Sequence, residues 1–95
     1  MSSLQVGYVE ANGTVIPIFA TAAALGAWDR ATGAWQTVSL LGRYFPLPHP
    51  LLPARSPNNS GEVAAYPAPE GAALVASGHA TAVGTASPQQ GTYTA

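Results

Sequence analysis

Polar and hydrophobic positions alternate near the start of the chain, which is the pattern of a half-buried β-strand. The alternation covers residues 4–9, and a second apolar run covers residues 14–19. Between them stands Asn12-Gly13, a pair that accepts the positive φ values of a type I′ turn. We therefore predict a β-hairpin with Asn12 and Gly13 as its turn. Pro17 has no N–H to donate, so the returning strand is predicted to lie at a sheet edge or to be bulged there.

Trp28 and Trp35 each end a copy of the tripeptide Gly-Ala-Trp. A glycine inside a helix costs about 1 kcal/mol, so we predict a second hairpin here rather than a helix. Gly33 takes the left-handed position in its loop, and Asp29 at the opening of the loop accepts a backbone N–H. This register places Trp28 directly across from Trp35, and residues 36–41 complete the second strand.

A proline-rich segment follows, because residues 42–60 hold five of the nine prolines. Residues that precede proline avoid the helical region, so this segment is predicted to be an extended arm. Arg43, Tyr44 and Phe45 at its start are expected to anchor the arm on a partner, since aromatic and arginine residues are enriched among interface hot spots. The alternative is that Tyr44 and Phe45 belong to the core of the domain.

The middle of the arm matches the form P-x-x-P-x-R, which SH3 domains bind as a polyproline helix. We favour a rigid arm that lies on a partner, and an SH3-type ligand is the alternative. In either case the segment is predicted to be an interface, formed by Pro50, Leu51, Leu52, Pro53 and Arg55.

The remaining strands are predicted to be short. Residues 62–66 form one strand, which ends at Pro67, and residues 72–77 and 79–85 form two more, joined near Gly78. Residues 87–95 form a polar tail.

These elements predict a mainly β fold, a small body of short antiparallel strands and hairpins with a long proline-rich extended arm and extended termini. The predicted divisions are a hairpin-rich body at 1–41, the proline-rich arm at 42–60, a short-strand segment that completes the body at 61–86, and the tail at 87–95.

The composition limits how many residues of this chain its own hydrophobic core can keep ordered. Hydrophobic residues make up 47% of the chain, but 19 of them are alanine, and only 7% of residues are charged. Such a core is not expected to order an extended arm and both termini by itself. We therefore expect these segments to lie on neighbouring subunits of a homo-oligomer or on a different protein.

Several classes of partner are excluded by the same numbers. The three basic residues, Arg30, Arg43 and Arg55, are too few to neutralise a row of phosphates, so direct nucleic-acid binding is not expected. The apolar run at 15–28 is shorter than the roughly 20 residues of a membrane span. Without cysteine there is no disulfide or zinc–thiolate site.

Titratable side chains are few and widely spaced. No pattern among them matches a metal site, a catalytic triad, a phosphate loop or a dinucleotide motif. We therefore predict a non-enzymatic protein with no catalytic residue, no metal and no cofactor. The side chains considered are Glu10, Asp29, His49, Glu62, Glu70 and His79.

One segment resembles small tailed-phage virion proteins, in which an apolar strand reaches an Asp-x-x-x-Gly turn and a Trp-x-x-Val strand returns. The alanine-, glycine-, proline- and threonine-rich composition is also similar to that of lambdoid head-decoration proteins, although the proline arm departs from their pattern. The resemblance is carried by Ala27, Trp28, Asp29, Thr32, Gly33, Ala34, Trp35 and Val38.

The resemblance implies a capsid decoration, or cement, protein that binds the outside of the expanded phage head, commonly as a trimer, and holds neighbouring capsomers together. Its partner would be the major capsid protein or another virion subunit. It would be made in the host cytoplasm and be located on the capsid surface. The alternatives are a head-fibre, neck or tail accessory protein, and a soluble adaptor that presents the P-x-x-P-x-R segment.

Overall fold

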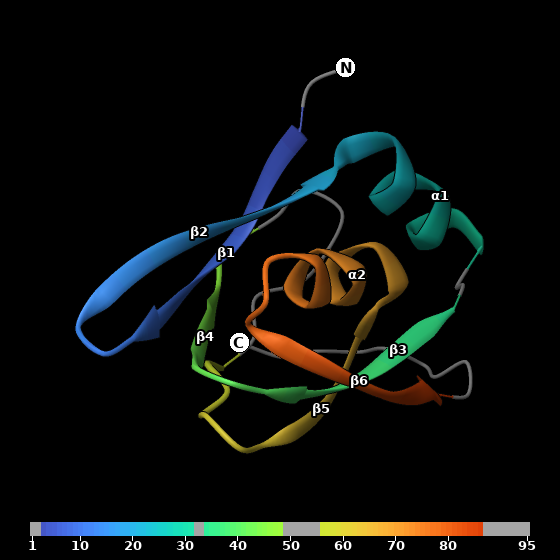
Figure 1. The fold of residues 1–95 in the computed structure, drawn as a ribbon. Coiled ribbons are helices and arrows are strands. Elements are labelled where there is room, and N and C mark those ends of the chain that lie inside the picture. Colours follow the sequence, from blue (N-terminus) through green and yellow to red (C-terminus); the bar gives the residue numbers. More distant parts are fainter. Residues whose placement is uncertain (1–2, 32–33, 49–55, 87–95) are drawn as a thin grey trace.

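Two small antiparallel sheets and two short helices form the part of the chain that the computed structural model describes, residues 3–31, 34–48 and 56–86 (Figure 1). One sheet has the strand order β2-β1-β4 and the other β5-β3-β6. Helix α2 contacts β2 as well as all three strands of the second sheet, so it joins the two sheets. This confirms the predicted mainly β class. The elements are β1 (Ser3–Ala11), β2 (Thr14–Thr21), α1 (Ala22–Ala31), β3 (Trp35–Leu40), β4 (Arg43–Pro46), β5 (Val63–Pro67), α2 (Ala68–Ala76) and β6 (Ala80–Ala86).

The first hairpin forms as its turn residues predict. Asn12 and Gly13 have φ values of 53° and 77°, and Ala11 pairs with Thr14 across them. Both central φ values are positive, as a type I′ turn requires. Strand β2 is an edge strand of its sheet, which confirms the prediction made from Pro17.

The second predicted hairpin is wrong, because Ala22–Ala31 forms helix α1. The Thr21 hydroxyl caps this helix by accepting the Ala24 N–H at 3.3 Å, and the alanine-rich first turn has the highest intrinsic helix propensity. Together with the burial of Leu25, these contributions exceed the cost of one internal glycine. Asp29 consequently lies in α1 and opens no hairpin loop, while Gly33 lies outside the described residues.

The predicted contact between the two tryptophans nevertheless exists. Trp28 of α1 and Trp35 of β3 pack edge to face, with ring centroids 5.0 Å apart and an interplanar angle of 88°. The two rings therefore join a helix to a strand rather than the two strands of one hairpin.

The strand predicted at 72–77 is also wrong, because Ala68–Ala76 forms helix α2. Proline is tolerated in the first helical turn, where its missing N–H would have no partner within the helix, so Pro69 fits as the second residue of α2. The helix ends at Ala76, and Ser77 is its C-cap. Gly78 follows in the left-handed region, with a φ of 80°. The N–H groups of Gly78 and His79 donate to the carbonyls of Val75 and Leu74 respectively, which is a Schellman motif.

The other predicted strands are present. Strand β3 covers most of the segment predicted at 36–41, β5 that predicted at 62–66, and β6 that predicted at 79–85. Residues 43–46 of the predicted arm form β4, which pairs with β1 inside the first sheet. The part of the arm at 49–55, and the tail at 87–95, lie outside the described residues.

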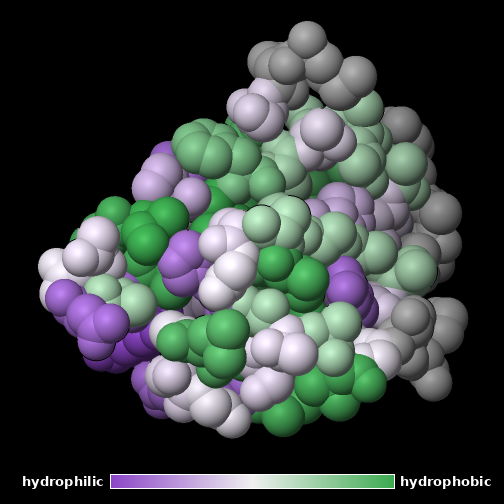
Figure 2. All heavy atoms as spheres, viewed as in Figure 1, coloured by the Kyte–Doolittle hydropathy of each residue, from purple (hydrophilic) through white to green (hydrophobic). Residues whose placement is uncertain are grey.

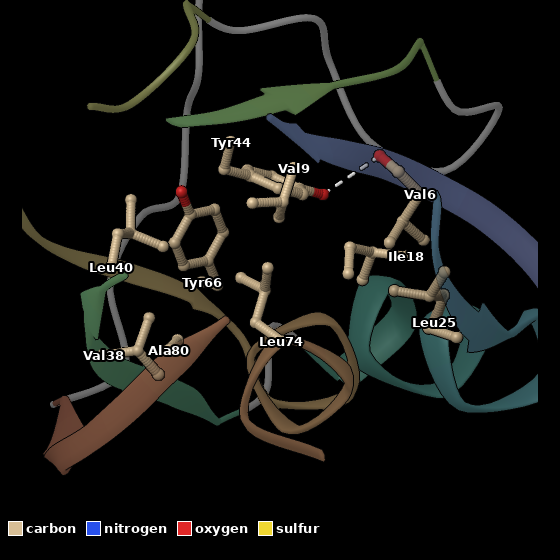
Figure 3. Close-up of a cluster of buried hydrophobic side chains, with 11 residues drawn as sticks. Val6, Val9, Ile18, Leu25, Val38, Leu40, Tyr44, Tyr66, Leu74 and Ala80 are labelled. Atoms are coloured by element: carbon tan, nitrogen blue, oxygen red, sulfur yellow. Dashed lines mark hydrogen bonds between the residues drawn. The ribbon is translucent and has the colours of Figure 1, made fainter. Parts of the chain in front are cut away.

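The core lies between the two sheets and draws on both helices (Figure 3). Tyr44 and Tyr66 fill its centre, with their rings 5.3 Å apart and nearly perpendicular. Aliphatic side chains surround them, and the cluster consists of Val6, Val9, Ile18, Ala20, Leu25, Val38, Leu40, Tyr44, Tyr66, Leu74 and Ala80.

Candidate interaction surface

The β2-β1-β4 sheet has one face in the core and one face toward solvent. On β4, Tyr44 is buried whereas its neighbours Arg43 and Phe45 point to the other side, because successive side chains of a strand alternate. On β2, Ile18 is buried, whereas Val15 is 57% exposed. The outward side of this sheet is therefore open over all three strands.

Three side chains are stacked on this outward side. The rings of Tyr8 and Phe45 lie 4.8 Å apart and only 11° from parallel. The Arg43 guanidinium lies over the Phe45 ring, with Cζ 4.8 Å from the ring centroid. This geometry combines aromatic stacking with a cation–π contact, and each of the two contacts stabilises the folded chain by roughly 0.5–1.5 kcal/mol.

The stack belongs to a row that crosses the sheet. Tyr8 of β1 is paired with Pro17 of β2 on one side and with Phe45 of β4 on the other. Beyond β4, Asn58 forms an antiparallel bridge to Tyr44, with both backbone hydrogen bonds, at 2.8 and 2.9 Å. In an antiparallel pair the residue before Asn58 lies beside the residue after Tyr44, so the exposed Pro57 extends the row next to Phe45.

A second row carries the two charges of this surface. Glu10 of β1 is paired with Val15 on β2 and with Arg43 on β4. Glu10 and Arg43 are both exposed, and no ion pair joins them to each other or to another residue in the described part of the chain. We call the two rows together the aromatic face, which consists of Tyr8, Glu10, Val15, Pro17, Arg43, Phe45 and Pro57.

Proline shields the free edge of this sheet. In a two-residue hairpin the residues that flank the turn, here Ala11 and Thr14, form a hydrogen-bonded pair, and such pairs alternate along the ladder. Counting along the register places Tyr8 and Pro17 in a pair without hydrogen bonds. The nitrogen of Pro17 therefore points away from β1, where its missing hydrogen costs no ladder bond and removes a donor from the open edge.

Beneath the aromatic face a buried polar cluster holds β1 and β4 together. The Tyr44 hydroxyl lies 3.1 Å from the Val6 carbonyl oxygen (Figure 3). The same hydroxyl is hydrogen-bonded to the Glu70 carboxyl group. Glu70 is 0% exposed. The Asn58 side-chain amide donates to the Tyr66 hydroxyl. These polar groups join β1, β4, β5 and α2 within the core, so their arrangement is that of a structural cluster.

The residues predicted to form a partner interface divide into three groups. Arg43 and Phe45 lie on the aromatic face, while Tyr44 lies in the core, which was the alternative interpretation of this residue. Whether Arg43 and Phe45 contact a partner stays a prediction. The remaining predicted interface residues, Pro50, Leu51, Leu52, Pro53 and Arg55, lie outside the described residues.

The titratable residues are spread over the molecule. Glu10 and Glu62 are exposed, and Glu70 is buried against Tyr44. The His79 ring lies 3.0 Å from the Ser77 hydroxyl in the turn after α2. Within residues 3–31, 34–48 and 56–86 no three of the potential metal ligands come together.

Sequence reasoning did not identify Tyr8, Pro17 and Pro57 as parts of this surface. The alternation in β1 did place Tyr8 on one side of a strand, but the row becomes visible only when the β1–β4 register is known.

Comparisons with protein-family models, curated proteins and solved structures found no match. Neither helix of the described residues has the length and apolar character needed to cross a bilayer.

Proposed function

We propose that this chain is a non-enzymatic structural subunit of a virion, a decoration or cement protein that binds the outside of the assembled phage head. The observation that carries the proposal is that both sheets expose large apolar side chains in a chain with only 7% charged residues. Figure 2 shows such side chains distributed between pale, weakly polar residues over the visible surface. The exposed fractions lie between 48% and 58%, for Val15, Phe19, Leu41, Val63 and Val83.

A cement subunit has to touch at least two neighbours at once. Here Val15 and Phe19 are on β2 of one sheet, and Val63 and Val83 are on the edge strands of the other sheet. One small body thus offers two separate apolar contact surfaces. The low charge reduces the desolvation penalty when such surfaces are covered.

The mechanism would be stabilisation by mass action. A subunit that binds only the assembled shell lowers the free energy of that state by an amount that grows with its concentration relative to its dissociation constant. The small residues that dominate the second sheet, Ala65, Thr81 and Gly84 among them, would let its backbone approach the shell closely. The resemblance of residues 25–40 to small tailed-phage virion proteins supports the same role.

The test compares virions that carry the protein with virions from which it is missing. Release of the genome on heating, followed with a DNA-binding dye, is expected at a lower temperature without the protein and at the original temperature after it is added back. The variant Val63→Glu/Val83→Glu should fail to restore heat tolerance, whereas the exposed control Glu62→Gln should restore it. Equal heat tolerance with and without the protein would contradict the proposal.

The same particles distinguish the location on the virion. Gold labelling of an epitope tag on the chain is expected over the whole head surface. Labelling confined to the neck, the tail or a head fibre would instead assign the chain to an accessory role at that position. Loss of all virion labelling together with capture by SH3 domains, abolished by Pro50→Ala/Pro53→Ala, would favour the adaptor alternative.

A further inference from the structure

We propose that the aromatic face binds a second copy of this chain, across a two-fold axis that runs parallel to the strands between β1 and β4. This inference rests on the geometry of the face and does not depend on the decoration role. It assigns the contact between copies to the β2-β1-β4 sheet and leaves the β5-β3-β6 sheet for other partners.

The order of residues in the row fits this two-fold axis. From one margin to the other it is Pro17, Tyr8, Phe45 and Pro57, on columns spaced about 4.8 Å apart. A two-fold axis midway between the second and third columns exchanges the outer pair and the inner pair. Each proline of one copy then lies opposite a proline of the other, and Tyr8 lies opposite Phe45.

The two charges of the aromatic face fit the same axis. Glu10 lies in the same column as Tyr8, and Arg43 in the same column as Phe45. The axis that matches the first row therefore also places Glu10 of each copy opposite Arg43 of the other. An axis along β1 would instead set Glu10 against Glu10, and like charges across an interface cost several kcal/mol. Charge complementarity thus selects the same axis as the aromatic row.

Association through the edges of the sheet is disfavoured at both of its margins. Association through the β2 edge would need the N–H that Pro17 lacks, and the opposite margin is covered where Asn58 bridges to Tyr44. Packing face to face, at about 10 Å between aligned sheets, needs no edge donors. The face is also preorganised, since Tyr8, Phe45 and Arg43 are already stacked and lose little side-chain freedom on binding.

The size of the aromatic face determines how tightly the two copies are expected to bind each other. Three strands and one bridged segment make a narrow interface, at or below the lower limit of stable complexes, which bury about 1,200 Å² in total. We therefore expect a dimer that dissociates on dilution, measurable by sedimentation velocity over a wide range of protein concentration. Wild-type chain should shift from monomer to dimer as its concentration rises.

The decisive experiment reverses the charges. Glu10→Arg and Arg43→Glu should each raise the dissociation constant of the dimer at least about tenfold. In either variant the two-fold axis creates two pairs of like charges that face each other across the interface. The double variant Glu10→Arg/Arg43→Glu should return it to within about threefold of wild type. Glu62→Arg, a matched reversal at an exposed position that is not part of the aromatic face, should leave dimerisation unchanged.

Folding is checked independently of association. The near-ultraviolet circular dichroism of the Trp28–Trp35 pair, which lies away from the aromatic face, should be the same in every variant. If a reversal on β1 or β4 prevents folding, Pro57→Glu serves as the second variant, since it lies outside the regular strands and should also weaken the dimer.

Four results would each overturn the proposal. They are a wild-type chain that stays monomeric at every concentration, a wild-type trimer, a dimer that survives both single reversals, and a double variant that does not recover. A monomeric chain whose face variants lose binding to virions would show that the shell, rather than a second copy, covers this face.

Discussion

Gly7 lies on the inward side of β1 where Tyr44 of β4 passes closest to the backbone. A Cβ atom added at Gly7 would lie 2.5 Å from the Tyr44 hydroxyl oxygen and 2.5 Å from the backbone oxygen of Phe45. Neither contact can be relieved by a flexible chain end, because one atom is backbone and the other belongs to a buried ring. Gly7→Ala therefore has to separate β1 from β4 or displace the Tyr44 ring.

The expected loss of stability follows from these two contacts. Overpacking a close-packed core by one methyl group costs about 1–3 kcal/mol. Displacement of the Tyr44 ring would also weaken the contact of its hydroxyl with the Val6 carbonyl, which adds roughly 0.5–1.5 kcal/mol. We expect Gly7→Ala to lower the free energy of unfolding by about 2–4 kcal/mol, and the midpoint of thermal unfolding by roughly 10–30 °C for a domain of this size.

Gly84 in β6 provides the matched control. Among the residues that the structure describes, no atom lies within 4 Å of a Cβ added there, and the φ of Gly84 is not in the left-handed region. Alanine is favoured over glycine in a strand by roughly 0.5–1 kcal/mol, so Gly84→Ala should be neutral or slightly stabilising. Urea denaturation followed by tryptophan fluorescence measures both variants. Equal stabilities of Gly7→Ala and Gly84→Ala would refute the close-approach argument.

Four further substitutions test other parts of the fold by the same denaturation assay. A Cβ added at Gly13 meets no atom within 4 Å in the described part of the chain, but Gly13→Ala has to adopt a φ of 77°. The substitution should therefore cost about 1–2 kcal/mol from backbone strain alone, and an unchanged midpoint would contradict the turn. Tyr44→Phe removes the hydroxyl that contacts Val6 and Glu70 and should cost about 1–3 kcal/mol; no loss would show that the polar cluster is not stabilising. Trp28→Phe should cost under about 1.5 kcal/mol, because its buried Nε1 has no hydrogen-bond partner in the described part of the chain, whereas Trp35→Ala should cost about 3–5 kcal/mol.

The elements that the sequence predicts correctly are those fixed by one or two special residues. Asn12 and Gly13 determine the first turn because few other pairs accept two successive positive φ values. Pro17 places β2 at an edge because it has no N–H. Such constraints act over one or two residues and need no knowledge of the rest of the fold.

Both helices were missed for a common reason. Their segments consist mostly of alanine and other small apolar residues, and such runs show neither a period of 2 nor one of 3.6. Tertiary packing decides whether such a run forms a helix or a strand. In α2, Gly71 lets the helix approach β3 so closely that a Cβ there would lie 3.0 Å from the Gln36 side chain, and Leu74 is fully buried beside it.

The candidate surface was predictable in part. Arg43 and Phe45 stand out by residue type, but the proline content predicts an arm for the segment that holds them, and an arm places their neighbour Tyr44 on the same surface. Once residues 43–46 are known to be a strand, alternation alone places Tyr44 inward. The contribution of Pro57 could not be predicted, because it depends on the bridge between Asn58 and Tyr44, which are distant in sequence.

The first sheet carries aromatic side chains on both its inner and its outer side. Because Gly7 has no side chain, the Tyr44 ring can lie directly against β1, and on the other side of the sheet the ring of Phe45 lies 4.8 Å from that of Tyr8. A chain so rich in alanine thus places Tyr44 against Tyr66 of β5 on the inside and Tyr8 against Phe45 on the outside. The outer pair is already stacked before it meets a partner, so it gives up little side-chain entropy on binding.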